Sequence, residues 1–287
     1  MTALVIDGNS LVYRVYYASY KQLELYKSEN KTPLNAVKLF LLIILKIVHQ
    51  KQYDYMLIAF DAKKKTNRHD TYKEYKGERK PMPEDLVVQL PIINKIMDQL
   101  KINYTKIDGF EADDIIGSYA KIMNEQKINV EIFSSDKDML QLVNDLTVVT
   151  LFKTGISDTV TVNPQNFGEI FHGLTPKNVT DFKGISGDAS DNLNGVKGIG
   201  PKTAAELILK YGSLEGIYEH IDELSESQKA KFIASKEHAV MCKALSTINC
   251  DVLDSINWET YRFQPIDKNV LMTIIQTYHF HGFDKYL

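Results

Sequence analysis

The residues of this sequence that could do chemistry are carboxylates gathered in short runs. The stretch 109–117, GFEADDIIG, places Glu111, Asp113 and Asp114 within four positions, just ahead of apolar residues. Carboxylates this close repel one another, and each raises the cost of ionising the others. Bound cations would relieve that repulsion, so the stretch is a candidate metal site.

The elements that position these acids read as alternating strands and helices. Apolar runs predict five strands, at 2–6, 55–60, 103–107, 129–133 and 146–152. Helical stretches separate them, among them 33–50, roughly 84–100, and one that begins at the Glu111 group with apolar residues at a period near 3.6. This alternation predicts an α/β fold with a mostly parallel sheet and helices on both faces.

Four separate stretches then deliver carboxylates to one edge of that sheet. Asp7 and Asp61 end the first two strands, the Glu111 group follows the third, and Asp136 and Asp138 follow the fourth. Ligands of open α/β sheets bind beyond the carboxyl ends of the strands. Any one acid has a structural explanation, since Asp114 could cap a helix and Asp136 could shape a turn. Clustering of the whole set at one edge favours a functional site.

The donor set indicates the kind of metal. Asp188 and Asp191 add a D-x-x-D pair, so the candidate ligands number nine: Asp7, Asp61, Glu111, Asp113, Asp114, Asp136, Asp138, Asp188 and Asp191. Oxygen ligands suit Mg²⁺ or Mn²⁺, and the seven histidines fall in no metal-ligand spacing. Without the nine acids, the net charge of −3 becomes +6. Nine carboxylates exceed the needs of one ion, so we expect two or more, which suits phosphoryl displacement.

Adjacent positions on a helix point about 100° apart. Asp113 and Asp114 are therefore expected to serve the site unequally, one of them directly and the other through water.

A basic segment accompanies the acids. Residues 62–80 hold eight Lys or Arg against three acids, a local net charge of +5. Most charge runs are solvated loops. Here Tyr72 and Tyr75 lie among the bases and could stack nucleobases, while Arg68, Lys76 and Arg79 could hold a phosphate.

A second phosphate signal lies in the run 195–203, GVKGIGPKT. Glycines let a ligand approach the backbone, and the helix that starts at Pro201 and ends before Gly212 would present free N–H groups to an anion. Lys202 adds charge. Many ordinary turns look alike, but this one follows the D-x-x-D pair closely and could grip the backbone of one duplex strand without reading sequence.

Composition excludes other classes. Two cysteines and no signal peptide fit a reduced, cytoplasmic protein without disulfides. The longest apolar run, 39–45, is far shorter than the roughly 20 residues of a membrane span. The second half reads as short helices, with a last one at 268–280.

Five runs resemble the signature blocks of the 5′-nuclease, or flap endonuclease, family. They are IDGNSLVYRVYYA, FDAKKKTNRHDTYKEYKGER, GFEADDIIG, SSDKDMLQLV and GDASDNLNGVKGIGPKTA. Their order and spacing match from residue 2 to about 210. The chain is most similar to bacterial 5′–3′ exonucleases and to the 5′-nuclease domain of DNA polymerase I; since no polymerase portion follows, we expect a stand-alone form.

The resemblance implies a PIN-like catalytic core at 1–175, with a helical arch at about 62–90. It also implies a helical DNA-binding subdomain at 176–287, with a helix–three-turn–helix motif at about 184–212. A single-stranded 5′ end would pass through or under the arch.

The resemblance also implies roles for individual residues. The first metal's group would be Asp7, Asp61, Glu111, Asp113, Asp114 and Asp136, and the second's Asp136, Asp138, Asp188 and Asp191. Lys76 and Arg79 would engage the scissile phosphate as catalytic residues. K⁺ would bind main-chain carbonyls at Ile185, Ser186, Asn194, Val196 and Ile199, although many relatives have Pro where this chain has Asn194. The predicted DNA-binding residues are Arg14, Arg68, Tyr72, Tyr75, Gly198, Gly200, Lys202 and Thr203.

The expected function is that of a metal-dependent, structure-specific 5′ nuclease, a 5′–3′ exonuclease and flap endonuclease acting in replication and repair. Its partners would be DNA with a 5′ flap or 5′ end, duplex plus single strand, and RNA primer–DNA hybrid, with no membrane and a monomer as the default. Two alternatives stay open: a PIN-type ribonuclease acting on single-stranded RNA, and a non-catalytic protein that binds DNA junctions.

Overall fold

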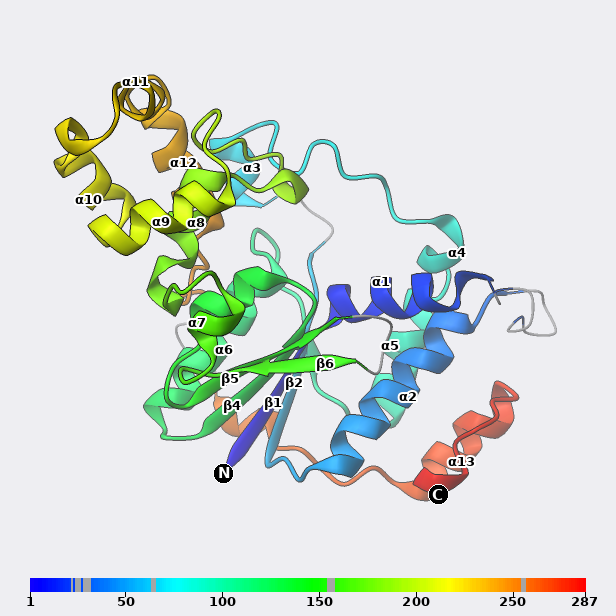
Figure 1. The fold of residues 1–287 in the computed structure, drawn as a ribbon. Coiled ribbons are helices and arrows are strands. Elements are labelled where there is room, and N and C mark those ends of the chain that lie inside the picture. Colours follow the sequence, from blue (N-terminus) through cyan, green and yellow to red (C-terminus); the bar gives the residue numbers. More distant parts are fainter. Residues whose placement is uncertain (22, 24–26, 28–31, 63–65, 154–157, 254–256) are drawn as a thin grey trace.

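A six-stranded sheet forms the centre of the molecule, in the order β3-β2-β1-β4-β5-β6 (Figure 1). The computed structural model describes residues 1–21, 23, 27, 32–62, 66–153, 158–253 and 257–287, so Lys63, Lys64 and Lys65 of the basic segment lie outside it. The strands are β1 (Thr2–Asp7), β2 (Tyr55–Ala59), β3 (Tyr104–Thr105), β4 (Asn129–Ser134), β5 (Thr147–Phe152) and β6 (Thr159–Val162).

Five of these strands were predicted, and they pair in parallel, which confirms the mostly parallel sheet. The sixth, β6, pairs antiparallel with β5 at the edge of the sheet and was not predicted. Its four residues alternate threonine with valine, and only Val162 is buried. A strand this short and polar gives little hydrophobic signal.

Successive residues of β1 point to opposite faces of the sheet, and each face has its own core. Leu4 and Ile6 belong to the core of one face and Ala3 and Val5 to that of the other. The first core is completed by α1 (Gly8–Ser19), α2 (Asn35–Gln50), α5 (Leu90–Gln99) and α13 (Lys268–Thr277). The second is completed by α6 (Ala112–Glu125) and by helices of the second half. Helices thus cover both faces, as predicted.

The helical stretch predicted at 84–100 is two helices, α4 (Glu84–Val87) and α5. Gln89, between them, is buried, and its Oε1 accepts hydrogen bonds from the backbone N–H groups of Ala36 (2.9 Å) and Val37 (3.2 Å). The first N–H groups of a helix have no partner within the helix. The break therefore serves α2, whose first turn lacks a capping side chain of its own.

The second half is helical, as predicted. It consists of α7 (Phe167–Ile170), α8 (Val179–Ser186), α9 (Pro201–Tyr211), α10 (Leu214–Glu219), α11 (Glu226–Ala234) and α12 (Lys236–Ser246). The last helix, α13, lies apart from these and packs in the core of α2 and α5. The division at residues 175 and 176 stays a prediction. Among the described residues, no helix is both long and apolar enough to cross a membrane.

The predicted arch region links the two halves. Its first helix, α3 (Asn67–Thr71), lies against the helical half, where Arg68 Nε donates to Leu245 O (3.0 Å). Tyr75, Leu193 and Leu245 share a small core there. The chain then crosses beside α1 to reach α4 (Figure 1). The segment between α3 and α4 is held at both ends by different parts of the fold.

Gly117 fixes how closely α6 packs, and its substitution tests this packing. A Cβ at this position would lie 2.5 Å from Ile248 Cγ2 and 2.9 Å from Cys250 Sγ. Overpacking of this kind costs about 1–3 kcal/mol. Gly117→Ala should therefore lower the melting temperature by about 5 °C in a thermal unfolding scan.

Gly168→Ala is the matched control for this prediction. Gly168 is also helical, but its Cβ would meet no atom closer than 3.7 Å. Equal melting temperatures for the two variants would contradict the close packing of α6.

Candidate active site

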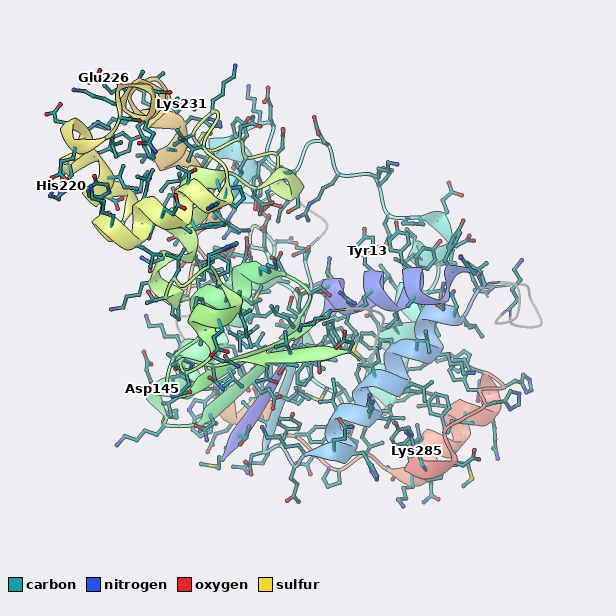
Figure 2. All side chains as sticks on the ribbon, viewed as in Figure 1. Tyr13, Asp145, His220, Glu226, Lys231 and Lys285 are labelled. Carbon is teal, nitrogen blue, oxygen red and sulfur yellow. The ribbon has the colours of Figure 1, made fainter. Side chains whose placement is uncertain are left out.

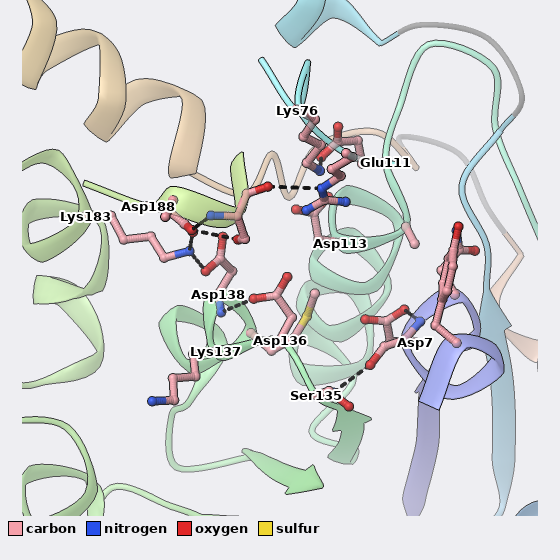
Figure 3. A pocket seen from close by; sticks show the side chains of 18 of the residues that line it. Asp7, Lys76, Glu111, Asp113, Ser135, Asp136, Lys137, Asp138, Lys183 and Asp188 are labelled. Atoms are coloured by element: carbon pink, nitrogen blue, oxygen red, sulfur yellow. Dashed lines mark hydrogen bonds and ion pairs between the residues drawn. The ribbon is translucent and has the colours of Figure 1, made fainter. Parts of the chain in front are cut away.

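The predicted acids converge on one cavity of about 970 Å³ beyond the carboxyl ends of the strands (Figure 3). Seven of the nine line it: Asp7, Asp61, Glu111, Asp113, Asp136, Asp138 and Asp188. The other two lie outside the lining: Asp114 accepts a hydrogen bond from Arg68, and Asp191 accepts hydrogen bonds from Tyr75 and Arg79. Lys76 and Arg79 of the arch region also line the cavity. The predicted edge of the sheet therefore does bring these side chains together.

Three of these carboxylates form no ion pair with any described residue: Asp7, Asp61 and Asp136. They lie at or just after the carboxyl ends of the neighbouring strands β1, β2 and β4. Short hydrogen bonds orient two of them, because Asp7 accepts from Ser134 Oγ (2.7 Å) and Asp61 accepts from the backbone N–H of Ala112 (2.8 Å). Fixed oxygens without a cation fit the requirements of a divalent ion.

Asp7 shows the electrostatic cost of this arrangement. Its pKa is raised to about 7, mainly because the side chain is buried and in smaller part because of the nearby charges of Asp61 and Asp136. Hydrogen bonds from Ser10 and Ser134 act in the opposite direction but do not offset the burial. A cation in the cavity would stabilise the ionised form of this side chain.

Glu111 is the N-cap residue of α6 and is compensated by bases of the arch region. Its Oε2 lies 2.7 Å from Lys76 Nζ and 3.1 Å from an Arg68 nitrogen. Burial alone would raise the pKa of Glu111, but these two cations outweigh it and hold the pKa below its usual value.

Asp113 and Asp114 are turned apart, as the helical geometry predicts. Asp113 lines the cavity, and burial raises its pKa. Asp114 forms a two-pronged pair with Arg68, with distances of 2.9 and 2.6 Å, and accepts from the backbone N–H of Asn249 (2.9 Å). Asp113 therefore faces the cavity, and Asp114 ties α6 to Arg68.

A second group of acids lies on the side of the helical half. Carboxylate oxygens of Asp138, Asp188 and Asp191 all lie within 4.8 Å of one another. Asp188 accepts hydrogen bonds from the backbone N–H and hydroxyl of Ser190, which fixes its direction. This all-oxygen donor set fits a hard divalent cation such as Mg²⁺ or Mn²⁺.

Lys183 neutralises part of this second group and was missed in the sequence. It projects from α8 and pairs with both Asp138 and Asp188 (Figure 3). Burial raises the pKa of Asp188, yet the Lys183 ammonium and the Ser190 hydrogen bonds bring it below its usual value. The signal was available, since Lys183 stands five residues before Asp188.

The structure corrects the prediction that Tyr75 could stack a base. Tyr75 is only 2% exposed, and its hydroxyl donates to Glu111 (3.2 Å) and Asp191 (3.0 Å). A buried ring offers no face to a nucleobase. Tyr75 instead braces the carboxylates that Lys76 and Arg79 also contact.

The other predicted nucleic-acid contacts of the arch region also have protein partners. Arg68 donates to Asp114 and to the carbonyl oxygens of Leu245 and Thr247, so its guanidinium holds the fold together. Tyr72 is partly buried and donates to Glu74 (2.9 Å). Arg79, with a side chain 47% exposed, pairs with Asp191 at 2.6 Å and still reaches the cavity.

Arg14, also predicted to bind DNA, lies on α1 at the cavity. Its Nε donates to Ser135 Oγ (2.7 Å), and another nitrogen donates to Phe152 O (3.0 Å). These bonds hold the guanidinium at the carboxyl ends of β4 and β5.

The glycine-rich turn between α8 and α9 packs backbone against backbone. Gly187 and Gly195 have positive φ angles, and a Cβ on Gly195 would lie 2.4 Å from Gly187 N. Of the five carbonyls predicted for K⁺, those of Ile185 and Val196 accept backbone hydrogen bonds, from Val196 N–H and Ile199 N–H. Each carbonyl oxygen has a second lone pair, so a K⁺ role stays a prediction.

The start of α9 presents the predicted phosphate-binding residues. Gly200 is its N-cap residue, Pro201 its first residue, and Lys202 is exposed. Thr203 is partly exposed, and so is the backbone entry to the helix, while Gly198 O accepts from Lys231 Nζ (3.0 Å). Their contact with DNA stays a prediction.

Comparison with known families agrees with the two halves of the fold. The family model described as 5′-3′ exonuclease, N-terminal resolvase-like domain, matches residues 2–172. The one described as 5′-3′ exonuclease, C-terminal SAM fold, matches residues 174–269. Fold and site together define a nuclease built on a resolvase-like α/β domain.

Individual proteins give the same result. A 5′-3′ exonuclease of Mycoplasma pneumoniae is 40% identical over 96% of this chain and 95% of its own length. DNA polymerase I of Bacillus subtilis is 38% identical over 97% of this chain but only 31% of its own length. The chain belongs to the 5′-3′ exonuclease family, as the resemblance implied.

A solved structure of the bacteriophage T5 D15 flap endonuclease, in a pseudo-enzyme-product complex with DNA and metal ions, shares the fold. Its TM-score is 0.68 at 20% identity, covering 97% of this chain and 98% of that one.

The raised pKa of Asp7 predicts a pH-dependent stability in the absence of metal. A raised folded-state pKa stabilises the fold below the unfolded value of 3.8, and this stability is lost as pH rises through about 7. Asp7→Asn removes the titration. The melting temperatures of the variant and of wild type are compared in EDTA at pH 5 and at pH 8. The variant's melting temperature, relative to that of wild type, should be higher at pH 8 than at pH 5 by an amount on the order of 5 °C.

Asp145→Asn, at an exposed acid away from the cavity, provides the control. If the difference in melting temperature between Asp7→Asn and wild type stays constant from pH 5 to pH 8, the pKa of Asp7 is not raised in the folded state.

Proposed function

We propose that this chain is a divalent-metal-dependent, structure-specific 5′ nuclease that hydrolyses DNA at 5′ flaps and 5′ ends. The nine acids are its metal ligands, Mg²⁺ or Mn²⁺ its cofactor, with two or more ions, and K⁺ an additional ion at the glycine-rich turn. DNA with a duplex beside a single-stranded 5′ arm is the substrate, and the RNA primer of a hybrid is a second one. The enzyme acts in replication and repair, in the cytoplasm, as a monomer.

One observation supports this proposal most directly. Asp7, Asp61 and Asp136 open into one cavity from three neighbouring strand ends, and no described cation pairs with them. Bound cations would relieve the repulsion among these three carboxylates. The T5 flap endonuclease, which shares the fold, was crystallised with DNA and metal ions.

Bound divalent ions would supply Lewis acidity and an activated water for an in-line attack on phosphorus. The chain's own residues hold and orient the reactants. Ser134 and Ala112 fix the directions of the Asp7 and Asp61 carboxylates, so the donor oxygens are in place before substrate arrives. Burial of Asp7 keeps water from screening its charge.

Lys76 and Arg79 are the cations that a scissile phosphate would meet. Both line the cavity from the arch region, opposite the strand ends. Lys76 has a left-handed backbone (φ 54°), and its N–H donates to Asp191 O (3.1 Å), which directs its side chain inward. Fixed positive groups stabilise the charge that develops on a phosphate in the transition state.

The duplex side of the substrate would lie on the helical half. The exposed entry to α9 offers free backbone N–H groups, and Lys202 adds a charge beside them. This contact would be made with the sugar-phosphate backbone of the DNA and not with the bases, so binding would depend on DNA shape and salt concentration and not on base sequence.

Cleavage of a 5′-labelled double-flap DNA tests the proposed function. Wild type should cut at or within about one nucleotide of the junction in Mg²⁺ and not in EDTA. Asp136→Asn removes a charge at the meeting point of the two acid groups and should lower cleavage by about 10³-fold or more, with DNA affinity largely kept. Asp145→Asn, at the exposed turn before β5, should behave as wild type.

The same assay separates the alternatives. Only mono- or dinucleotide products would define an exonuclease. Cleavage of single-stranded RNA but not of flap DNA would favour the ribonuclease. Tight binding without cleavage, in both Mg²⁺ and Mn²⁺, would favour a junction-binding protein.

Lys202→Ala tests the duplex contact. Removing one phosphate contact should weaken binding alike for all sequences and reduce the slope of log affinity against log salt by about 1. Fluorescence anisotropy at several salt concentrations measures both. Lys285→Ala, at an exposed lysine near the C-terminus, is the control. A sequence-selective loss of affinity would contradict this role.

A further inference from the structure

Three tyrosines form a row along α1 and its C-cap position, beside the cavity; the first is partly buried and the other two are exposed. Tyr13, Tyr17 and Tyr20 are spaced by four and three residues, so they share one face of the helix. Tyr17 is 62% exposed and Tyr20 is 55% exposed, among the most exposed large side chains of the described residues. Large aromatic rings left in solvent on one face suggest a binding surface.

Contacts between rings fix this surface. The rings of Tyr13 and Tyr17 are nearly parallel, at 16°, with centroids 6.5 Å apart. Tyr16, which is buried, meets the rings of Tyr17 and Tyr20 edge to face, at 5.2 and 5.6 Å. The buried ring of Tyr16 therefore supports the two exposed rings, which lose little conformational entropy when a ligand binds.

The row begins inside the catalytic cavity and leads away from it. Tyr13 and Tyr17 line the same cavity as Asp7 and Arg79, while Tyr20 lies beyond its lining. Figure 2 shows Tyr13 on α1, on the side of the segment that joins α3 to α4. The surface is thus continuous with the place where a phosphodiester would be cut.

We propose that Tyr17 and Tyr20 extend the active site into a stacking platform for the single-stranded 5′ arm of the substrate, beyond the scissile phosphate. The inference rests on the proposed function. Stacking on aromatic rings is tolerant of sequence because every base has a π-face. The platform therefore holds the arm of any substrate and favours arms long enough to reach it.

Charge and length support a nucleic-acid strand as the occupant. Arg14 and Arg79 line the cavity beside the first two tyrosines and are placed to balance backbone phosphates. Tyr20 lies seven positions after Tyr13, which is a helical rise of roughly 10 Å, or about three stacked nucleotides. Affinity should therefore rise with arm length up to about three nucleotides and then level off.

The test measures binding without cleavage, in EDTA, on duplexes with 5′ arms of none, one, three and six nucleotides. 2-Aminopurine at the second arm position reports stacking by loss of fluorescence. The double variant Tyr17→Ala/Tyr20→Ala should lose about tenfold in affinity for the three-nucleotide arm and much less for the armless duplex. Fluorescence quenching by this variant should fall as well.

Tyr17→Phe/Tyr20→Phe keeps the ring faces and should retain both affinity and quenching, which a role of the hydroxyl groups would not predict. Met272→Ala, at an exposed apolar residue of α13, is the control for loss of apolar surface. Equal dependence on arm length in wild type and in the alanine variant would overturn the platform.

Cleavage of the same substrates in Mg²⁺ keeps the two proposals apart. A wild type that cuts none of them refutes the proposed function. A wild type and an alanine variant that cut with the same preference for arm length refute the platform alone.

Discussion

Repulsion among carboxylates at one edge of the sheet is the interaction on which the rest of the structure depends. Parallel strands end side by side, so the acids that follow them must meet. The cations that compensate them come from elsewhere: Arg68, Lys76 and Arg79 from the arch region, and Lys183 from α8. The arch region and the helical half are therefore joined to the sheet through the charges of the site itself.

Only some of these carboxylates have a protein cation beside them, and this difference has a functional meaning. Glu111, Asp114 and Asp191 are paired with protein cations, whereas Asp7 and Asp136 form no ion pair with any described Lys or Arg. A protein selected for stability alone would pair or neutralise such groups, because buried charge is costly. A site that gains its cations from solution must leave part of the repulsion unrelieved.

The sequence predicts much of this because strand ends are local signals. Five apolar runs that alternate with helical stretches predicted the mostly parallel sheet, and Asp7 and Asp61, which close the first two, marked the edge that holds the acids. The burial of Tyr75 and the position of Gln89 depend on contacts with residues far away in the sequence. The local pattern of apolar residues does not predict such contacts. The ion pairs of Lys183 also depend on the tertiary structure, although Lys183 and Asp188 are only five residues apart in the sequence.

The arch region and the metal ligands cannot act independently under the proposed function. Lys76 and Arg79 contact carboxylate oxygens of Glu111 and Asp191, two of the proposed metal ligands. Two cations in competition for one carboxylate weaken each other's binding, and this coupling is reciprocal. Metal binding would therefore loosen the hold of the site on Lys76 and Arg79 and free them for the phosphate. The same side chains that pair with Glu111 and Asp191 would then serve the reaction.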